Sequence, residues 1–134
     1  MTDKQDLQIL LIEENQKYIN VLKKYLDNYK GKKIRVQQIE RIEEAVIQLD
    51  FKSFDMLLLG LHLSGDIIKA SLDFIQNFSS KIPILVVSGI DDFSLSKKVI
   101  QAGAEDYIDN NEMNESLLHR SINYAIERHQ LKKQ

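Results

Sequence analysis

Hydrophobic residues in this chain fall either into short unbroken runs or into longer segments with helical spacing. The runs at 7–12, 56–61 and 84–87 are apolar almost throughout, which is typical of strands covered on both faces. An alternating segment at 34–37 predicts a strand nearer the edge of the sheet. The segment 106–109 predicts a fifth strand. The pattern therefore predicts five strands.

The segments between these strands have apolar residues every three or four positions, which predicts amphipathic helices. Asn15 and Asn114 are suitable N-caps for the first and the last helix. Gly31 and Gly103 are suited to end the first and the fourth helix. The helices are expected at 15–30, 43–49, 67–78, 94–102 and 114–131.

The same spacing predicts which side chains face the core. In the second helix, Ala45, Val46 and Leu49 are expected to point inward. His119 and His129 belong to the last helix and are expected at its surface, where basic residues near the end complement the helix dipole.

Strand and helix alternate five times, and only a few residues connect them. Right-handed crossovers then give a parallel sheet with helices on both faces. No linker, low-complexity segment or internal repeat interrupts the alternation. We expect a single α/β domain over 1–134, with its core at about 7–127 and its last helix extending to about 131.

Composition narrows the function classes. Hydrophobic residues make up 43% of the 134 positions and charged residues 28%, which is ordinary for a globular domain. The net charge of −2 provides no basic field for nucleic acid. Without cysteine there is no disulfide, thiolate metal site or cysteine nucleophile. No signal core or membrane-spanning stretch is present in the sequence, so we expect a cytoplasmic protein.

Chemistry in an open α/β sheet lies just beyond the carboxyl ends of the strands. The first strand is followed by Glu13 and Glu14, and the fourth ends at Ser88. The central strand has Gly60 near its carboxyl end, where this architecture leads us to expect a polar residue.

At these positions the chain resembles the receiver domain of bacterial response regulators, over essentially its whole length. The resemblance rests on LQILLIEEN, FDMLLLGLHLSGD, IPILVVSG and AGAEDYID, which occur in the family's order and spacing. It implies a flavodoxin-like, doubly wound sheet with strand order 2-1-3-4-5. It also implies a role in two-component or phosphorelay signal transduction.

In that family an aspartate after the third strand accepts a phosphoryl group from a histidine kinase. An acidic pair holds Mg²⁺, a hydroxyl residue contacts the phosphoryl group, and a lysine pairs with it. The resemblance carries these roles, one position at a time, to the following residues. The acidic pair is Glu13 and Glu14, the acceptor is Gly60, the hydroxyl residue is Ser88, and the lysine is Asn110. The aromatic switch position falls on Tyr107.

Two of these positions have lost the chemistry of the family. Gly60 has no carboxylate to attack phosphorus, and Asn110 has no positive charge to offer. Losing both the aspartate and the lysine leaves the formal charge of the site unchanged. Keeping only one of them would leave a partly buried charge unpaired. Glu13 and Glu14 are longer than the usual aspartates and lack the third ligand, so we expect at most weak cation binding and no dedicated metal site. The plain alternative for this pair is a solvated loop at a helix N-terminus.

We therefore expect a pseudo-receiver that is not an enzyme, needs no cofactor and acts as a protein-interaction or dimerisation module. Its partners would be signalling proteins such as a histidine kinase or an output domain. A homodimer would use the fourth helix, the fifth strand and the last helix, as receivers usually do.

Two alternatives stay open from the sequence. A still-switchable receiver would need an unusual acceptor, either His62 or Asp66, since Asp55 lies at the opposite end of the strand. A flavodoxin-like flavin or nucleotide binder would need a phosphate-binding loop after the first strand, but the loop there is acidic and repels phosphate.

Overall fold

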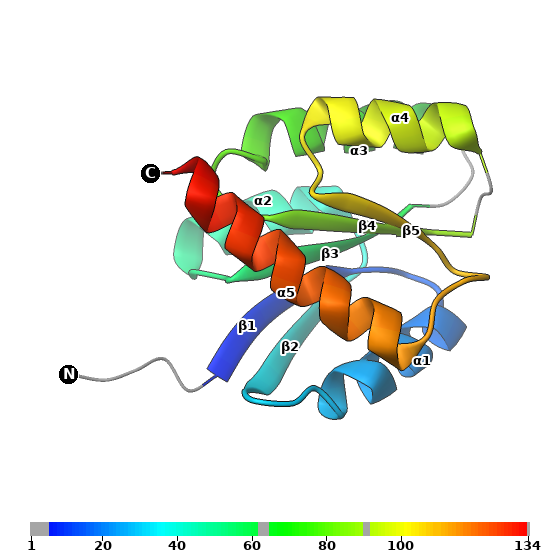
Figure 1. The fold of residues 1–134 in the computed structure, drawn as a ribbon. Helices are drawn as coiled ribbons and strands as arrows, with labels where there is room; N and C mark the ends of the chain where they lie inside the picture. Colours follow the sequence, from blue (N-terminus) through cyan, green and yellow to red (C-terminus); the bar gives the residue numbers. More distant parts are fainter. Residues whose placement is uncertain (1–5, 62–64, 90–91, 134) are drawn as a thin grey trace.

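The computed structural model describes residues 6–61, 65–89 and 92–133, and the side chains of 65–67 lie outside this description (Figure 1). Strand and helix alternate in the predicted order. The elements are β1 (Asp6–Ile12), α1 (Gln16–Asp27), β2 (Lys33–Ile39), α2 (Ile42–Phe51), β3 (Met56–Leu61), α3 (Gly65–Phe78), β4 (Ile84–Ser88), α4 (Phe93–Ala102), β5 (Asp106–Asp109) and α5 (Glu115–Lys132).

The five strands form one parallel sheet in the order β2-β1-β3-β4-β5, as expected. Alternate residues of each strand point to opposite faces, which produces two hydrophobic clusters. In β1, for example, Leu11 belongs to the cluster under α1 and α5, and Leu10 belongs to the cluster under α2, α3 and α4. Both faces of the sheet are therefore covered, which explains why the central strands are apolar throughout.

Strand register brings the functional positions to one edge of the sheet. Ile12 pairs with Leu59, so the residue after each of them lies at the same level. Ser88 pairs with Leu61 on one side and with Asp109 on the other. The carboxyl ends of β1, β3, β4 and β5 thus meet at one edge.

The helix ends follow the expected caps in part. The side chain of Asn15 accepts hydrogen bonds from the backbone of Lys17 and Tyr18, and Asn114 accepts one from Leu117. Gly103 adopts φ +123° directly after α4, which is the left-handed region that favours glycine. The expectation for Gly31 was wrong, because α1 already ends at Asp27 and the glycine, at φ +99°, lies in the turn before β2.

Two side chains face differently from the expectation. Val46 is exposed, because Ala45 and Leu49 occupy the inward side of α2 one turn apart. His129 is only 5% exposed, because it continues the inward stripe of Ile122 and Ala125 at helical spacing.

His119 is half-buried against α1, and its Nε2 lies 2.6 Å from the carbonyl oxygen of Tyr25. Its ring meets that of Tyr29 edge to face, with centroids 5.2 Å apart. The surface expectation was wrong for His129, which is buried although it lies in the basic last turn of α5 as expected. His119 is half-buried and packs against α1.

Among the described helices, none combines the length and the apolar character that a membrane crossing requires.

Candidate functional site

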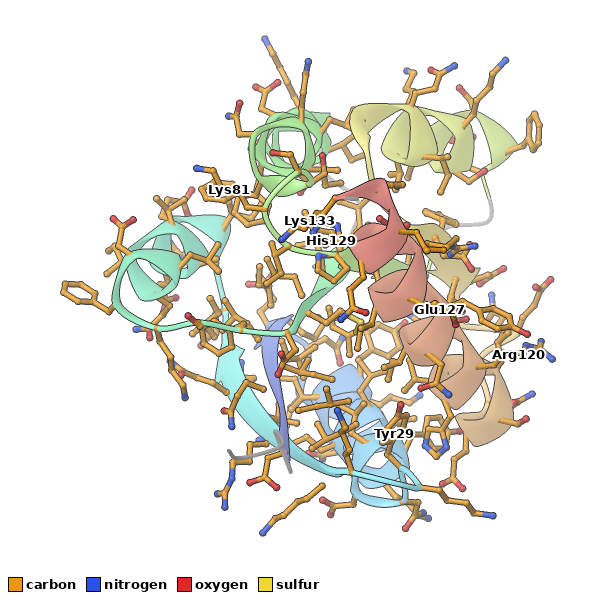
Figure 2. All side chains as sticks on the ribbon, turned by 60° about the vertical axis from the view of Figure 1, so that its left-hand side comes forward. Tyr29, Lys81, Arg120, Glu127, His129 and Lys133 are labelled. Atoms are coloured by element: carbon orange, nitrogen blue, oxygen red, sulfur yellow. The ribbon has the colours of Figure 1, made fainter. Side chains whose placement is uncertain are left out.

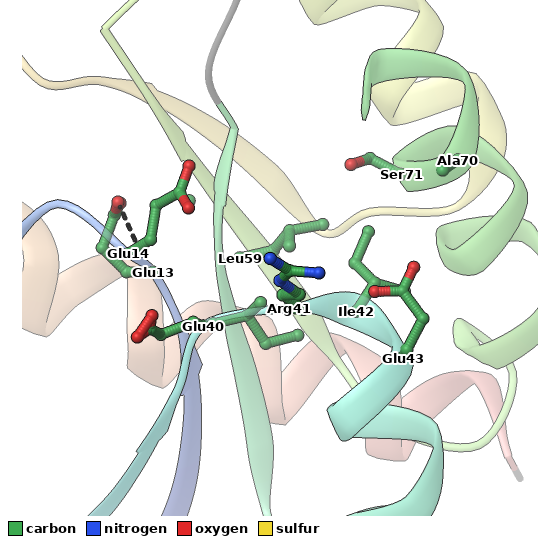
Figure 3. A pocket seen from close by; sticks show the side chains of 11 residues that line it. Glu13, Glu14, Glu40, Arg41, Ile42, Glu43, Leu59, Ala70 and Ser71 are labelled. Carbon is green, nitrogen blue, oxygen red and sulfur yellow. Dashed lines mark hydrogen bonds between the residues drawn. The ribbon is translucent and has the colours of Figure 1, made fainter. Parts of the chain in front are cut away.

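A pocket of about 320 Å³ opens at the edge of the sheet where β1 and β3 end (Figure 3). Its lining comes from β1, β3, the start of α2 and the middle of α3. The lining residues are Ile12, Glu13, Glu14, Glu40, Arg41, Ile42, Glu43, Leu59, Gly60, Ala70 and Ser71. The pocket therefore combines an apolar floor with four carboxylates and one guanidinium.

Glu13 is held firmly in this pocket and is only 2% exposed. Its Oε2 accepts hydrogen bonds from the backbone N–H groups of Glu14, at 3.0 Å, and Asn15, at 2.9 Å. Its own backbone N–H donates to the carbonyl of Ile39 across the sheet, at 2.9 Å. The solvated-loop interpretation is therefore wrong for Glu13, although it describes Glu14, which is exposed.

The Glu13 carboxylate occupies the space that a side chain at position 60 would need. A Cβ atom added to Gly60 would lie 2.8 Å from the carboxyl carbon of Glu13 and closer still to its Oε1. It would also lie 3.2 Å from the carbonyl oxygen of Ile12. The register between β1 and β3 explains this contact, because it places residue 13 beside residue 60.

Ser88 is fully buried at the end of β4 and does not line this pocket. Its carbonyl accepts a hydrogen bond from the backbone N–H of Asn110, at 2.7 Å.

The Asn110 side chain lines a separate pocket of about 190 Å³, together with Tyr18 and other residues of α1. Within the described part of the chain, Asn110 Nδ2 is buried without a hydrogen-bond partner. The structure thus brings together Glu13, Glu14 and Gly60, but it does not bring Asn110 into their pocket.

Tyr107 is half-buried and packs against the cluster under α2, α3 and α4. The two alternative acceptors, His62 and the side chain of Asp66, lie outside the described residues. Asp55 lies at the opposite end of the sheet, as expected, where its Oδ2 accepts a 2.7 Å hydrogen bond from the backbone of Gln8.

The donor set does not suit Mg²⁺. Glu13 commits Oε2 to two backbone amides and directs Oε1 at Gly60, which supplies no carboxylate. In the described ranges no three acidic or histidine side chains converge as ligands for one ion. Mg²⁺ requires near-octahedral oxygen coordination, so the residues present do not fit the ion that the family implies.

Sequence reasoning missed Glu40, Arg41, Glu43 and Ser71 as pocket residues. The first two follow β2, and the carboxyl edge of a parallel sheet was a usable signal for them. Glu43 lies in the first turn of α2. Ser71 sits in the middle of α3, where a single serine in an amphipathic pattern gives no signal of its own.

Comparisons with known proteins agree with this architecture. The sequence profile described as the response regulator receiver domain matches residues 9–122. The structure is similar to the signal receiver domain of an HD domain-containing protein from Pseudomonas fluorescens (TM-score 0.76, 16% identity, covering 93% of this chain and 98% of that chain). It is also similar to an orphan response regulator of H. pylori (TM-score 0.71, 24% identity, covering 92% and 99%).

A response regulator from Thermotoga maritima is similar as well (TM-score 0.73, 20% identity, covering 91% and 98%). No curated protein sequence matches the chain. At these identities the solved structures show the fold, and the profile match over most of the chain shows the family. The chain belongs to the response regulator receiver domain family of two-component signalling.

Proposed function

We propose that this chain is a pseudo-receiver, a receiver-fold interaction module that is not switched by aspartyl phosphorylation. The observation that carries the proposal is the overlap between Glu13 and position 60. The acceptor carboxylate is absent, and the buried carboxylate of Glu13 fills the space in which it would stand.

The charge distribution supports this proposal. A phosphoryl group brings negative charge and requires nearby cations or N–H donors. Among its described lining residues the pocket instead presents four carboxylates and one guanidinium, that of Arg41, and position 110 supplies no ammonium. Transfer of a phosphoryl group to this pocket would therefore place like charges together.

The outer surface supports the interaction role. Phe93 and Ile100 lie two turns apart on α4, and Tyr124 and Leu131 lie two turns apart on α5. All four are exposed, so each helix carries an apolar stripe. Figure 1 shows α4 and α5 with β5 running between them. We propose this surface as the contact for a signalling partner or for a second copy of the chain.

Intact-mass measurement tests the central part of the proposal. The purified chain is incubated with acetyl phosphate and Mg²⁺, and we expect no gain in mass. A stoichiometric gain of one phosphoryl group would overturn the proposal. Repeating a positive result with His62→Asn and with Asp66→Asn would then identify the alternative acceptor.

The interaction role has its own test. Light scattering of the chain and of the double variant Phe93→Ser/Tyr124→Ser compares their masses in solution. Since each substitution removes an exposed apolar side chain, we expect any dimer of the parent chain to dissociate in the variant. A dimer that persists unchanged would exclude this surface as its interface.

A further inference from the structure

The pocket at Glu13 and Gly60 has an acidic rim in which the described carboxylates outnumber the one guanidinium, that of Arg41. Glu14, Glu40 and Glu43 line it and are exposed. In the described part of the chain none of the three carboxylates forms an ion pair or accepts a hydrogen bond, and Arg41 makes no ion pair with them. The rim therefore favours a cation.

A second observation points to a ligand within the pocket. Ser71 is only 1% exposed, and its Oγ has no hydrogen-bond partner in the described residues. Figure 3 shows this hydroxyl directed from α3 toward the acidic side of the pocket. A buried hydroxyl without a partner costs free energy, so a donor that enters the pocket would recover it.

The shape of the pocket favours an elongated organic cation over a metal ion. The described carboxylates do not converge on one point. The floor is apolar and consists of Ile12, Ile42, Leu59 and Ala70. Lysine and arginine place an aliphatic stem on such a surface while the charged head stays among polar groups. A guanidinium or ammonium would donate to both the rim carboxylates and Ser71 Oγ.

The neighbouring surface of α2 indicates that this cation belongs to a protein. Glu43 lines the pocket, and Ile47 and Phe51 follow it at successive turns of α2 on the same side of the helix. Ile47 is exposed, and Phe51 is 83% exposed. An apolar stripe that begins at an acidic pocket complements a segment in which a basic residue stands beside apolar ones.

We propose that this pocket binds a lysine or arginine side chain of a partner protein, whose adjacent apolar residues pack on Ile47 and Phe51. The proposal deepens the proposed function, because it rests on a pocket that is not used for phosphoryl transfer. An acidic pocket that recognises a basic residue would then lie where active receivers carry out their phosphoryl chemistry.

Amide NMR titration tests the proposal with defined probes. The probes are the blocked peptide Ac-Leu-Arg-Leu-amide, its neutral counterpart Ac-Leu-Gln-Leu-amide, and free agmatine. We expect the arginine peptide to shift the amides of Gly60, Ala70 and Ser71 in a saturable way. The glutamine peptide should not shift them, and agmatine should bind more weakly than the arginine peptide.

Two matched variants make the result specific. Glu43→Gln removes a carboxylate that lines the pocket, whereas Glu44→Gln removes one from the next position of α2, which does not line it. We expect the first to weaken the arginine peptide about threefold and the second to leave it unchanged. Ser71→Ala should also weaken it.

Four results would overturn the proposal: no shift at the pocket, equal binding of the two peptides, equal weakening by the two glutamine variants, or tighter binding of agmatine than of the arginine peptide. Agmatine binding more tightly than the arginine peptide would assign the pocket to free polyamines instead. The mass measurement with acetyl phosphate is independent of these titrations, so a failure here leaves the pseudo-receiver proposal standing. A gain in mass there would instead overturn the pseudo-receiver proposal, on which this inference rests.

Discussion

Two glutamates of this protein have buried side chains, and their surroundings differ. Glu13 lies at the carboxyl edge of the sheet and is held by backbone N–H groups. Glu105 lies between α4 and β5, where its carboxylate meets basic side chains of α5. Both carboxylates have partners, and that of Glu105 forms ion pairs with Arg128 and Lys132.

The Glu105 cluster fixes the end of α5. Lys132 Nζ lies 3.0 Å from Glu105 Oε2, and Arg128 Nε lies 3.6 Å from Oε1. Arg128 also donates from Nη2 to the carbonyl oxygen of Glu105, at 3.0 Å. Arg128 and Lys132 lie beyond the end of the family match at residue 122, whereas Glu105 lies within it. These contacts tie the last turns of the helix to the domain.

The two carboxylates therefore have different roles. Glu105 acts as an anchor, because its cations come from another element and hold that element in place. Glu13 acts as a filler, because local backbone amides hold its Oε2 and its Oε1 faces Gly60. Removing Glu105 should loosen the end of α5, whereas crowding Glu13 should strain the edge of the sheet.

Crowding Glu13 is expected to have the largest effect. Gly60→Ala forces the carboxylate away from its two backbone donors, and we expect a loss of about 3 kcal/mol in the free energy of unfolding. Urea unfolding measures it. Gly89→Ala is the control, because its added Cβ would come no closer than 3.3 Å to another group, the hydroxyl of Tyr18. A similar small loss in both variants would show that Glu13 moves aside freely.

Removing the anchor should have a smaller effect. Glu105→Gln keeps the size of the side chain but removes its charge, and we expect a loss of about 1.5 kcal/mol, since Arg128 and Lys132 are largely exposed. Hydrogen exchange should rise mainly in the last two turns of α5. Asp73→Asn, an exposed position of α3, provides the control. Unchanged exchange in α5 would contradict the anchoring role.

The anchor cluster should also respond to pH. Burial lowers the pKa of His129, and Lys133 adds to this effect, whereas Glu105 and the backbone of Lys81 oppose it (Figure 2). Because the folded pKa lies below the unfolded value, the unfolded chain binds the proton more readily. Stability is therefore retained above the ordinary histidine pKa of about 6.5 and falls as the pH drops below it.

Unfolding at pH 7.5 and pH 5.5 measures this response. His129→Gln should reduce the difference in stability between the two pH values, whereas His119→Gln serves as the matched control on the same helix. A difference that stays the same in His129→Gln would assign the pH response to other groups.

The smallest expected effect concerns the pocket beside Glu13. Ser71→Ala removes a buried hydroxyl that has no partner in the described residues, so the free energy of unfolding should stay within about 0.5 kcal/mol of the parent chain. Ser121→Ala is the comparison, because Ser121 is also buried but lies on α5. A loss above about 1.5 kcal/mol for Ser71→Ala would show that the hydroxyl is bonded within the domain.

Much of this fold could be predicted from the sequence. Three apolar runs and the segments at 34–37 and 106–109 predicted all five strands, and the family's strand order was confirmed. The errors in predicted burial concern helical residues, because a shift of one position turns a side chain to a different side of the helix. Val46 lies next to Ala45 in sequence but about 100° away around the helix, and His129 continues an apolar stripe although it is polar.

The site could be predicted only in part. The carboxyl ends of the predicted strands located the site at one edge of the sheet, and Gly60 and Glu13 were both identified there. Their contact was not, because it depends on the register between β1 and β3 and on one additional methylene in Glu13. Asn110 was assigned to the same site by resemblance, yet its side chain lines the pocket beside α1.

The pseudo-receiver proposal depends most directly on Glu13 occupying the space of the missing acceptor carboxylate. Intact mass after incubation with acetyl phosphate and Mg²⁺ tests this in two variants, Gly60→Asp and Glu13→Asp/Gly60→Asp, with circular dichroism confirming that both fold. We predict little labelling of the single variant and a much larger labelled fraction in the double variant, because the shorter residue 13 frees the acceptor's space. Equal labelling of the two variants would contradict the account.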